Sequence, residues 1–339
     1  MIDLIHTTLL GMKRGADVSA ENTEAVIDAI LACEDRRLLV ELLSAWNEKG
    51  ITEDEIYGFA GVLRNRCRRI RGHEDSVDIV GTGGGSQKPF NVSTAAAIVT
   101  AAAGQKVAKH GNRAATSRSG AIDVLSALGL EPSLGPASAE MNLRRHGLAF
   151  LFAPAFHRLS SKLADARRSL PFPTIFNCIG PLANPAFAEY QVIGTWSEDL
   201  VPKVASALHR LGTKRSLVVN GSNGLDEISI NGTTIAAEVT AEGIRRYELA
   251  ADSFGLEASK ESLPKAECVA ESAARIRSVF EGELGPARDM VIANSAAAIF
   301  IAGGADSLVD AADIAADAID SGKTLEKLDI LSAEVAIAA

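Results

Sequence analysis

In the first part of the chain, apolar residues recur at intervals of three and four positions, which is the spacing of amphipathic helices. Thr52 and Glu55 form a capping box ahead of one such run, and Gly50 stands where the preceding run ends. No alternating strand pattern interrupts these runs. We therefore predict an N-terminal helical domain over residues 1–70. Its helices are expected at residues 20–32, 35–50 and 52–70.

From residue 77 the pattern changes to short β-branched runs that alternate with helical segments. The run VDIVG (77–81) precedes STAAAIVTAAAG (93–104), and KVAKHG (106–111) precedes SGAIDVLSALG (119–129). This alternation is typical of βαβ units with a parallel sheet. We predict an α/β fold in which a larger α/β domain over residues 73–339 carries a mainly parallel central sheet. Further strands are expected at residues 149–153, 190–196, 215–221, 233–239 and 245–250, and further helices at 161–170, 293–304 and 307–322.

The composition narrows the class of protein. The 339 residues carry a formal net charge of −9, which argues against a nucleic-acid partner because nucleic-acid-binding proteins usually present basic surfaces. The one strongly basic run, RNRCRRIR (64–71), is interpreted as a solvated helix end. The four cysteines form no CxxC pair, so neither a zinc site nor a disulfide framework is predicted. The N-terminus lacks signal-peptide features and no apolar run reaches the length of a membrane span, so we expect a cytoplasmic protein without a membrane partner.

The stretch DIVGTGGGSQKPFNVST (78–94) is the first candidate for binding chemistry. Its glycines lie between a predicted strand and a predicted helix, so bare N–H groups and the helix N-terminus would form an anion-binding site. Asn91, Ser93 and Thr94 add polar side chains at that helix end. The stretch lacks the GK[ST] ending of a Walker A motif and does not fit GxGxxG in full. A phosphate-binding loop is one interpretation, and an ordinary glycine-rich turn with a Ser/Thr helix cap is the other.

A second loop, AKHGNRAATSRSG (108–120), again lies between a predicted strand and a predicted helix. It brings Lys109, His110 and Arg113 together with Asn112 and several hydroxyl groups. Cations and donors at this density would bind a polyanion such as a pyrophosphate. We expect a functional role for His110 within this cluster, although an isolated histidine is more often structural.

Two further segments place charged residues in or beside predicted loops. In NGSNGLDEISING (220–232), Asp226 and Glu227 are adjacent carboxylates that would either hold Mg²⁺ against substrate phosphates or form a solvated acidic turn. The proline-rich PTIFNCIGPLANPA (173–186) follows Arg167. The Arg167 guanidinium would either clamp a carboxylate or make a surface salt bridge.

These four loops, in this order, resemble those of the anthranilate phosphoribosyltransferase family. The matching motifs are GTGGG…FNVST, KHGNR, FLFAP…His157…Arg167…TIFN…GPLANP, GLDEIS and, near the C-terminus, NSAAAIFIAGGADSL…AIDSGK. The likeness covers nearly the whole chain. It implies a small helical domain, on which part of residues 130–187 packs, and a larger α/β domain similar in fold to the pyrimidine nucleoside phosphorylases. It also implies an active site between the two domains and a homodimer.

The resemblance further implies a reaction and its residues. Phosphoribosyl pyrophosphate (PRPP) would donate its phosphoribosyl group to the amine of anthranilate in tryptophan biosynthesis, with two Mg²⁺ ions per chain. Lys109 and His110 would be catalytic. The metal ligands would be Ser93, Asp226 and Glu227, and the anthranilate contacts would be Gly81, Asn112, His157 and Arg167. The PRPP contacts would be Gly81, Gly84, Gly85, Pro89, Asn91, Val92, Ser93, Thr94, Lys109, His110, Gly111, Asn112, Arg113, Ala114, Ala115, Thr116, Ser117 and Ala121.

Several positions depart from the family pattern, and they put the identity of the acceptor in question more than the reaction class. RLSS (158–161) stands where the family has PAMK after His157. The other departures are Gly85 for an aspartate, Pro89 for a polar residue, Ala121 for a serine, Pro171 and Pro173 for the glycine and arginine of LGxRT, and Asn220 for a histidine. Two alternatives therefore stand beside the first function: a paralogous phosphoribosyltransferase that uses another aromatic acceptor, and a non-catalytic relative that binds nucleic acid.

Overall fold

A seven-stranded sheet forms the centre of the computed structural model, which describes residues 2–87, 89–113, 120–222 and 224–338. The strand order is β3-β2-β1-β4-β5-β6-β7. The strands from β3 to β5 in this order run parallel, and β6 and β7 extend the sheet as an antiparallel hairpin. The predicted α/β fold with a mainly parallel sheet is confirmed. The strands are β1 (Val77–Gly81), β2 (Val107–Gly111), β3 (Leu148–Phe152), β4 (Tyr190–Gly194), β5 (Arg215–Gly221), β6 (Thr234–Thr240) and β7 (Gly243–Leu249).

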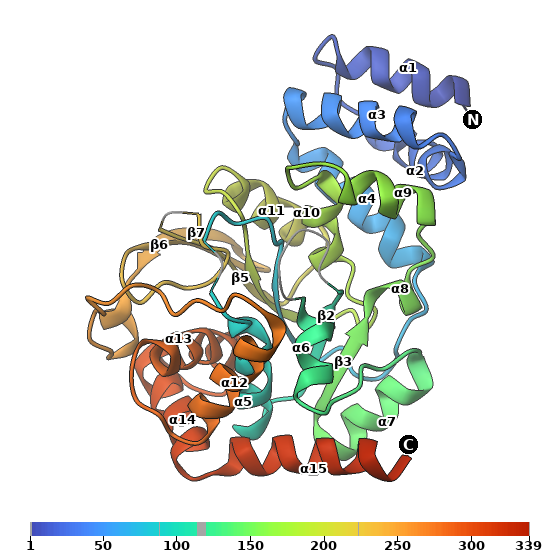
Figure 1. The fold of residues 1–339 in the computed structure, drawn as a ribbon. Helices are drawn as coiled ribbons and strands as arrows, with labels where there is room; N and C mark the ends of the chain where they lie inside the picture. The colour runs from blue at the N-terminus through green and yellow to red at the C-terminus, as the bar shows by residue number, and fades with distance from the viewer. Residues whose placement is uncertain (1, 88, 114–119, 223, 339) are drawn as a thin grey trace.

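Helices connect the parallel strands and cover both faces of the sheet (Figure 1). Within the described ranges, none of them has both the length and the apolar character needed to cross a bilayer. The N-terminal helices are α1 (Ile2–Met12), α2 (Thr23–Ala32), α3 (Arg36–Lys49) and α4 (Glu53–Arg66). Among the strands lie α5 (Val92–Ala102), α6 (Ala121–Ala127), α7 (Pro136–His146), α8 (Ala153–Phe156), α9 (Ser161–Arg168), α10 (Ile175–Leu182) and α11 (Leu200–Arg210). The C-terminal helices are α12 (Val269–Phe280), α13 (Pro286–Ile301), α14 (Leu308–Asp320) and α15 (Lys323–Ala338).

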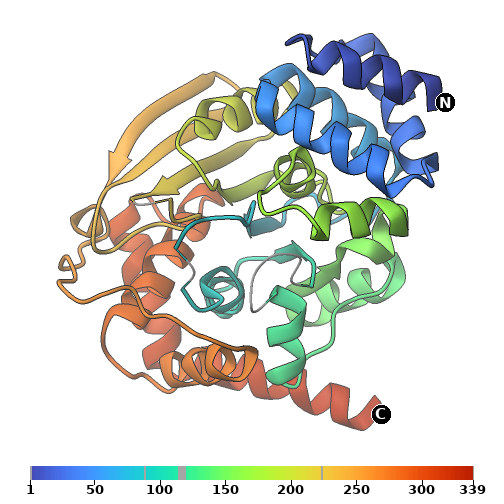
Figure 2. The same ribbon diagram turned by 45° about the horizontal axis from the view of Figure 1, so that its top comes forward.

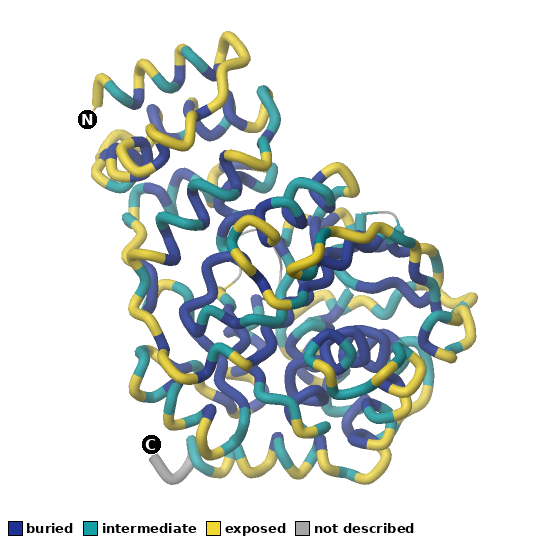
Figure 3. The backbone as a smooth tube through the Cα atoms, turned by 180° about the vertical axis from the view of Figure 1, so that it is seen from behind, coloured by how far each residue is buried: buried dark blue, intermediate teal, exposed yellow. Residues whose placement is uncertain are grey.

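Neighbouring residues of the central strands point to opposite faces of the sheet and enter two different cores. Val192 and Val219 belong to the core that contains α5, α12, α13 and α14. Ile193 and Val218 belong to the core that contains α10, α11 and the N-terminal helices. Because both faces are covered, the central strands are continuous apolar runs. Figure 3 shows buried residues throughout the interior of the larger body, and buried positions alternating with exposed ones along the N-terminal helices.

The N-terminal helices lie at the end of the molecule opposite α15 (Figures 1 and 2). α3 packs on α9, and α4 packs on α10 and α11. The predicted capping box is confirmed, since Thr52 and Glu55 exchange both hydrogen bonds at the start of α4. Glu55 is fully buried and also accepts from the Val18 N–H and from Nε1 of Trp46, each at 3.0 Å. This carboxylate ties three N-terminal segments together.

The basic run 64–71 is only partly a solvated helix end. α4 ends at Arg66, whose guanidinium pairs at the surface with acidic residues around α2. Arg64 is instead buried and donates to the carbonyl oxygens of Leu182 at 2.6 Å and Leu211 at 3.4 Å. The prediction is wrong for Arg64, because its side chain satisfies carbonyl groups at the C-terminal ends of α10 and α11.

Beyond the N-terminal domain, six helices of the described residues are absent from the predicted set: α7, α8, α10, α11, α12 and α15. α10 begins with a capping box formed by Thr174 and Asn177 and carries Pro181 in its last turn. It lies within the segment that the sequence presented as stiffened by prolines. α10 matters for function because residues at its C-terminal end line the cavity of the candidate site.

Candidate active site

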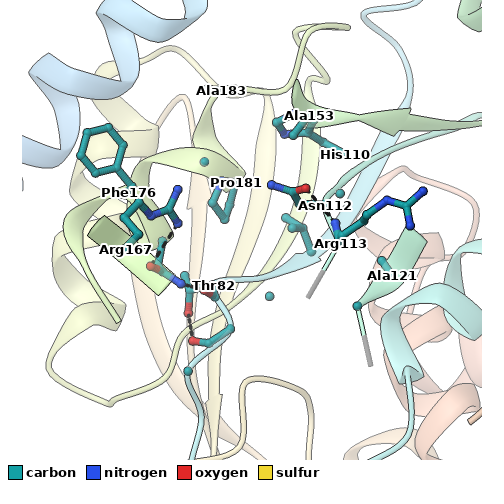
Figure 4. Close-up of a pocket in the computed structure, with 18 of the residues that line it drawn as sticks. Thr82, His110, Asn112, Arg113, Ala121, Ala153, Arg167, Phe176, Pro181 and Ala183 are labelled. Carbon is teal, nitrogen blue, oxygen red and sulfur yellow. Dashed lines mark hydrogen bonds between the residues drawn. The ribbon is translucent and has the colours of Figure 1, made fainter. Parts of the chain in front are cut away.

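Loops that follow the parallel strands meet around a cavity of about 550 Å³ at the carboxyl end of the sheet. The loops after β1, β2 and β5 build one wall, and α8, α9 and α10 with their connections build the other. β1 and β4 are neighbours from which the chain continues to opposite faces of the sheet, and open α/β sheets bind ligands at such a point. Figure 4 shows Arg167 and Phe176 on one side of the cavity and Asn112, Arg113 and Ala121 on the other.

The glycine-rich loop after β1 packs closely against the acidic turn after β5. The Gly83 N–H donates to Oδ2 of Asp226 at 2.9 Å. A Cβ atom at Gly81 would lie 2.7 Å from the same oxygen, and a Cβ atom at Gly85 would lie 2.7 Å from the carbonyl oxygen of Gly224. Glycine is therefore needed here because the two loops approach each other. Gly85, which stands where the family has an aspartate, fits this close packing. A larger residue at this position would push the acidic turn away.

Prolines contact the outer part of the same loop. Gly84 has a φ of 80°, and a Cβ atom there would lie 2.8 Å from Cβ of Pro173. Pro89 lines the cavity and forms an isolated antiparallel bridge with Lys265. The loop is thus packed against the α9–α10 connection and against the segment that precedes α12.

The N-terminal turn of α5 brings Ser93 to the cavity. Asn91, just before the helix, donates its N–H to Oγ of Ser272 and accepts a hydrogen bond from the same hydroxyl, each at 2.9 Å. Asn91 and Ser93 line the cavity, whereas Val92 and Thr94 are fully buried and are not among its lining residues. Ser272, on α12, therefore helps to fix the helix end at which an anion would bind.

Lys109 is a buried cation beside this helix end, with 3% of its surface exposed. Its Nζ donates to the carbonyl oxygen of Ile79 and, at 3.1 Å, to Oγ of Ser93. Burial lowers the pKa of Lys109, whereas the carboxylates of Asp78 and Glu227 raise it. The ammonium group therefore lies near two acids, beside the N-terminal turn of α5.

Asp226 and Glu227 both line the cavity. Burial raises the pKa of Glu227 and the neighbouring Asp226 raises it further, whereas Lys109 and the Ser93 N–H lower it. Two carboxylates at such close range favour a divalent cation, and Mg²⁺ takes carboxylate, hydroxyl and phosphate oxygens. The described residues contain no group of three or more His, Cys, Asp or Glu placed to hold a metal. The two carboxylates with the nearby Ser93 hydroxyl would fit a Mg²⁺ ion, which takes oxygen ligands.

His110 and His157 form a buried pair with their ring centroids 5.2 Å apart. His110 donates to the carbonyl of Gly180 and His157 to that of Ala183, at the C-terminal end of α10. Nε2 of each ring has no partner in the described structure. Burial lowers the pKa of His110 to about 3 and that of His157 to about 4. Both rings are therefore neutral near pH 7 and present a free acceptor nitrogen.

The loop after β2 forms the wall opposite Arg167 (Figure 4). Gly111, Asn112, Arg113 and Ala121 line the cavity. Arg113 is exposed and lies 3.4 Å from Asp123, so it keeps donors for a ligand. The PRPP contacts expected at Ala114, Ala115, Thr116 and Ser117 lie outside the described residues.

Arg167 is a largely buried cation on the far wall. Its Nη2 donates to Oδ1 of Asn177 at 3.3 Å, its guanidinium lies 5.4 Å from the centroid of the Phe176 ring, and its Nε has no partner in the described structure. Burial lowers the pKa of Arg167 to about 10, which leaves it charged at pH 7. Arg168 pairs with Asp165, but Arg167 makes no ion pair with any described residue. A buried cation without an acidic partner favours an anionic ligand.

Asn177 is a site residue that the sequence did not single out. Its Oδ1 accepts from Arg167 and from the Thr174 N–H at 3.0 Å, and its Nδ2 donates to the carbonyl oxygen of Thr82 at 3.0 Å. One amide therefore joins the arginine wall to the glycine-rich loop. Its place in the TIFN motif is the signal that could have found it.

The chain is similar to known proteins along nearly its whole length. Residues 73–325 match the family model described as "Glycosyl transferase family, a/b domain". The anthranilate phosphoribosyltransferase of Methanosarcina acetivorans is 41% identical over 320 residues, which cover 94% of this chain and 86% of the relative. The crystal structure of anthranilate phosphoribosyltransferase from Thermus thermophilus matches with a TM-score of 0.86 at 35% identity, covering 97% of this chain and 99% of that one. The enzyme of that name from Saccharomyces cerevisiae, solved in complex with PRPP and Mg, matches with a TM-score of 0.85 at 26% identity, covering 97% and 98%.

Proposed function

Because the chain belongs to the anthranilate phosphoribosyltransferase family, we propose that it transfers the phosphoribosyl group of PRPP to the amine of anthranilate and releases pyrophosphate. It would then be a glycosyltransferase of tryptophan biosynthesis. The observation that carries this proposal is the pairing of two unlike walls in one cavity. One wall presents a helix N-terminus, Lys109 and two carboxylates, and the other presents Arg167 without an acidic partner among the described residues.

The first wall suits the donor. Loss of pyrophosphate leaves an oxocarbenium-like ribose and a leaving group that gains negative charge. The Lys109 ammonium and the N–H groups at the start of α5 would stabilise that charge, and their interaction strengthens as the bond breaks. Ser93, Asp226 and Glu227 would hold Mg²⁺, which when bound would neutralise the pyrophosphate. We carry magnesium over from the solved yeast complex with PRPP and Mg.

The second wall suits the acceptor. Arg167 would bind the carboxylate of anthranilate, and Phe176 would limit where the ring lies. The amine nitrogen then forms a bond to C1 of the ribose as the bond from C1 to the pyrophosphate oxygen breaks. An aryl amine is a weak nucleophile, so most of the acceleration would come from positioning and from leaving-group stabilisation.

The amine must also lose a proton. Among the described residues that line the cavity, His110 and His157 each have an unpartnered, neutral Nε2 that can accept a proton. An N-aryl ammonium centre is strongly acidic, so a weakly basic imidazole can accept its proton. We propose that His110 takes this proton and that His157 helps to orient the amine, with the new C–N bond already formed when transfer occurs.

The principal alternative is a phosphoribosyltransferase that uses an acceptor other than anthranilate. One set of residues favours it. Arg158, Leu159, Ser160 and Ser161 all line the cavity, and they replace the PAMK pattern of the family. A paralogue would keep the donor wall and use a different aromatic amine or heterocycle here. The same residues therefore define where specificity would differ.

One assay separates these functions. The protein is mixed with PRPP, Mg²⁺ and anthranilate, and the loss of anthranilate fluorescence is followed together with pyrophosphate release. We expect both signals, each dependent on PRPP and Mg²⁺. Turnover of PRPP with other aromatic acceptors but not with anthranilate would support the paralogue. Salt-dependent DNA binding without PRPP turnover would support the nucleic-acid-binding relative.

Four features remain predictions. The two Mg²⁺ ions per chain and the homodimer follow from the resemblance. The cytoplasmic location and the domain division into residues 1–70 and 73–339 follow from the sequence pattern. The shared core between the N-terminal helices and α9, α10 and α11 supports the idea that part of residues 130–187 packs on the helical domain.

A further inference from the structure

β1 and β2 are paired only at their amino-terminal ends. Their register contains one pair, Val77 opposite Val107, whereas β1 pairs with β4 over five residues. Continuing the β1–β2 register would place Ile79 opposite Lys109. A parallel ladder would then join the Ile79 N–H to the carbonyl of Ala108 and the carbonyl of Ile79 to the N–H of residue 110.

Side chains satisfy these four main-chain groups instead. The His110 N–H donates to Oδ1 of Asp78 at 3.1 Å, and the Ile79 N–H also hydrogen-bonds the Asp78 carboxylate. The carbonyl of Ala108 accepts from Nδ2 of Asn184 at 2.8 Å. The remaining carbonyl, that of Ile79, accepts from Nζ of Lys109. Side chains thus replace the whole missing rung of the ladder.

Asp78, Lys109 and Asn184 form what we call the polar wedge. Asn184 also donates to Oδ2 of Asp78 at 2.8 Å, so both carboxylate oxygens have a donor. Asp78 and Asn184 are fully buried, and Lys109 is nearly so. Neither Asp78 nor Asn184 lines the cavity, whereas Lys109 and His110 do.

Such a wedge is a costly way to satisfy main-chain groups. An ordinary ladder would pair the same N–H and carbonyl groups without burying a carboxylate and an ammonium. Burial raises the pKa of Asp78 to about 6 even though Lys109 and the surrounding donors lower it, which shows that the site opposes the charge. The separation of β1 and β2 at their carboxyl ends has a geometric consequence that offsets this cost. It gives the Lys109 side chain room to contact both the Ile79 carbonyl and Ser93.

We propose that the polar wedge is a positioning device for the reaction: Asp78, held by Asn184, keeps β2 apart from β1 and thereby places the Lys109 ammonium and the His110 ring. Asp78 and Asn184 are positioning residues, since they act through Lys109 and His110. The catalytic consequence rests on the proposed function, whereas the effect on strand pairing does not.

The test compares two buried carboxylates changed to amides in the full-length protein. Asp78→Asn would face the Asn184 amide with a second NH₂ group and disturb the wedge. Glu55→Gln is the matched control, since Glu55 is equally buried and hydrogen-bonded but lies in the N-terminal helices. Thermal midpoint, kcat, KM for PRPP and anthranilate, and amide exchange of residues 107–111 by mass spectrometry are measured for each variant.

For Asp78→Asn we expect a loss of at least tenfold in kcat, smaller changes in KM and faster exchange in residues 107–111. For Glu55→Gln we expect a lower thermal midpoint, kcat within twofold of the original protein and unchanged exchange in that segment. Equal kcat and equal exchange in the two variants would overturn the proposal. If Asp78→Asn does not fold, Asn184→Ser is judged by the same criteria.

The exchange readout separates this inference from the proposed function. If the unaltered protein turned over no PRPP, the proposed function would fail, and faster exchange in Asp78→Asn would still support the wedge. If the unaltered protein is active and Asp78→Asn changes neither exchange nor kcat, the wedge proposal fails and the proposed function stands.

Discussion

Gly83 donates its main-chain N–H to Oδ2 of Asp226 at 2.9 Å, which joins the loop after β1 to the turn after β5. These strands are not neighbours, since β4 lies between them. The glycine-rich loop and the candidate metal ligands are therefore joined in a single hydrogen-bonded unit above the sheet. Changes to either loop should affect both donor binding and metal binding.

The acidic pair is the first place to test this unit. Asp226→Asn combined with Glu227→Gln should lower turnover at least 100-fold, because it removes the carboxylates proposed to hold Mg²⁺. Turnover is measured across a Mg²⁺ titration. The exposed Glu242→Gln, in the β6–β7 turn, is the control and should have no effect. Activity within threefold of normal in the double variant would remove both residues from the metal site.

Gly85 tests the close approach of the two loops. Gly85→Ala should weaken Mg²⁺-dependent PRPP binding roughly tenfold and cost about 1–3 kcal/mol of stability, because the new Cβ would lie 2.7 Å from the Gly224 carbonyl oxygen. Calorimetric titration and thermal unfolding measure the two effects. Gly61→Ala, within α4 and without a neighbouring atom inside 4 Å, should instead stabilise by about 0.5–1 kcal/mol. Unchanged binding in Gly85→Ala would show that the loops can separate freely.

Arg167 tests the acceptor wall. Arg167→Ala should raise the KM for anthranilate roughly 30-fold, which corresponds to losing a charged hydrogen-bonded contact of about 2 kcal/mol, and leave the KM for PRPP nearly unchanged. Steady-state kinetics with each substrate varied in turn provide the measurement. Arg168→Ala is the matched control, because Arg168 is exposed and pairs with Asp165. An anthranilate KM that stays constant in Arg167→Ala would exclude the assigned role.

The histidine pair predicts how stability depends on pH. The unfolded chain binds a proton at each histidine near pH 6.5, whereas the pKa values in the fold are about 3 for His110 and about 4 for His157. Between pH 4 and pH 6.5 the unfolded state therefore holds more protons, so stability is complete above pH 6.5 and decreases as the pH falls. From pH 6.5 to pH 5 each histidine should contribute a loss of about 2 kcal/mol.

Denaturant unfolding at several pH values tests this dependence. The two histidines together should lower the free energy of unfolding between pH 6.5 and pH 5, and His157→Gln should remove about half of that decrease. A pH profile of His157→Gln that matched the original protein would contradict a neutral buried ring at this position.

The sequence predicted strands, helices and helix caps correctly where the residues that determine them lie within one short segment. The strands predicted at 77–81 and 106–111 are neighbouring parallel strands, and Thr52 with Glu55 forms the predicted cap. α10 was harder to predict because Gly180 and Pro181 weaken its helical signal, yet the helix ends there and Pro181 falls in its last turn. α12 and α15 carry regular helical spacing, so the signal for them was present in the sequence.

Residues that act across long distances in the chain were the ones that sequence reasoning missed. Asp78 meets Asn184, and Asn91 meets Ser272, only because the fold brings distant segments together. No local spacing indicates that a buried aspartate in a strand will replace a rung of the sheet. The predicted loops could be found from composition, but the side chains that hold those loops in place could not.

The amide of Asn177 limits how the specificity of this protein can be redesigned. It contacts both Arg167 and the Thr82 carbonyl, so libraries that vary this position would alter recognition of the aromatic partner and handling of the sugar diphosphate together. Residues 158–161 line the same cavity without that shared contact. Directed evolution toward new arylamine products should begin with those four positions and leave Asn177 fixed.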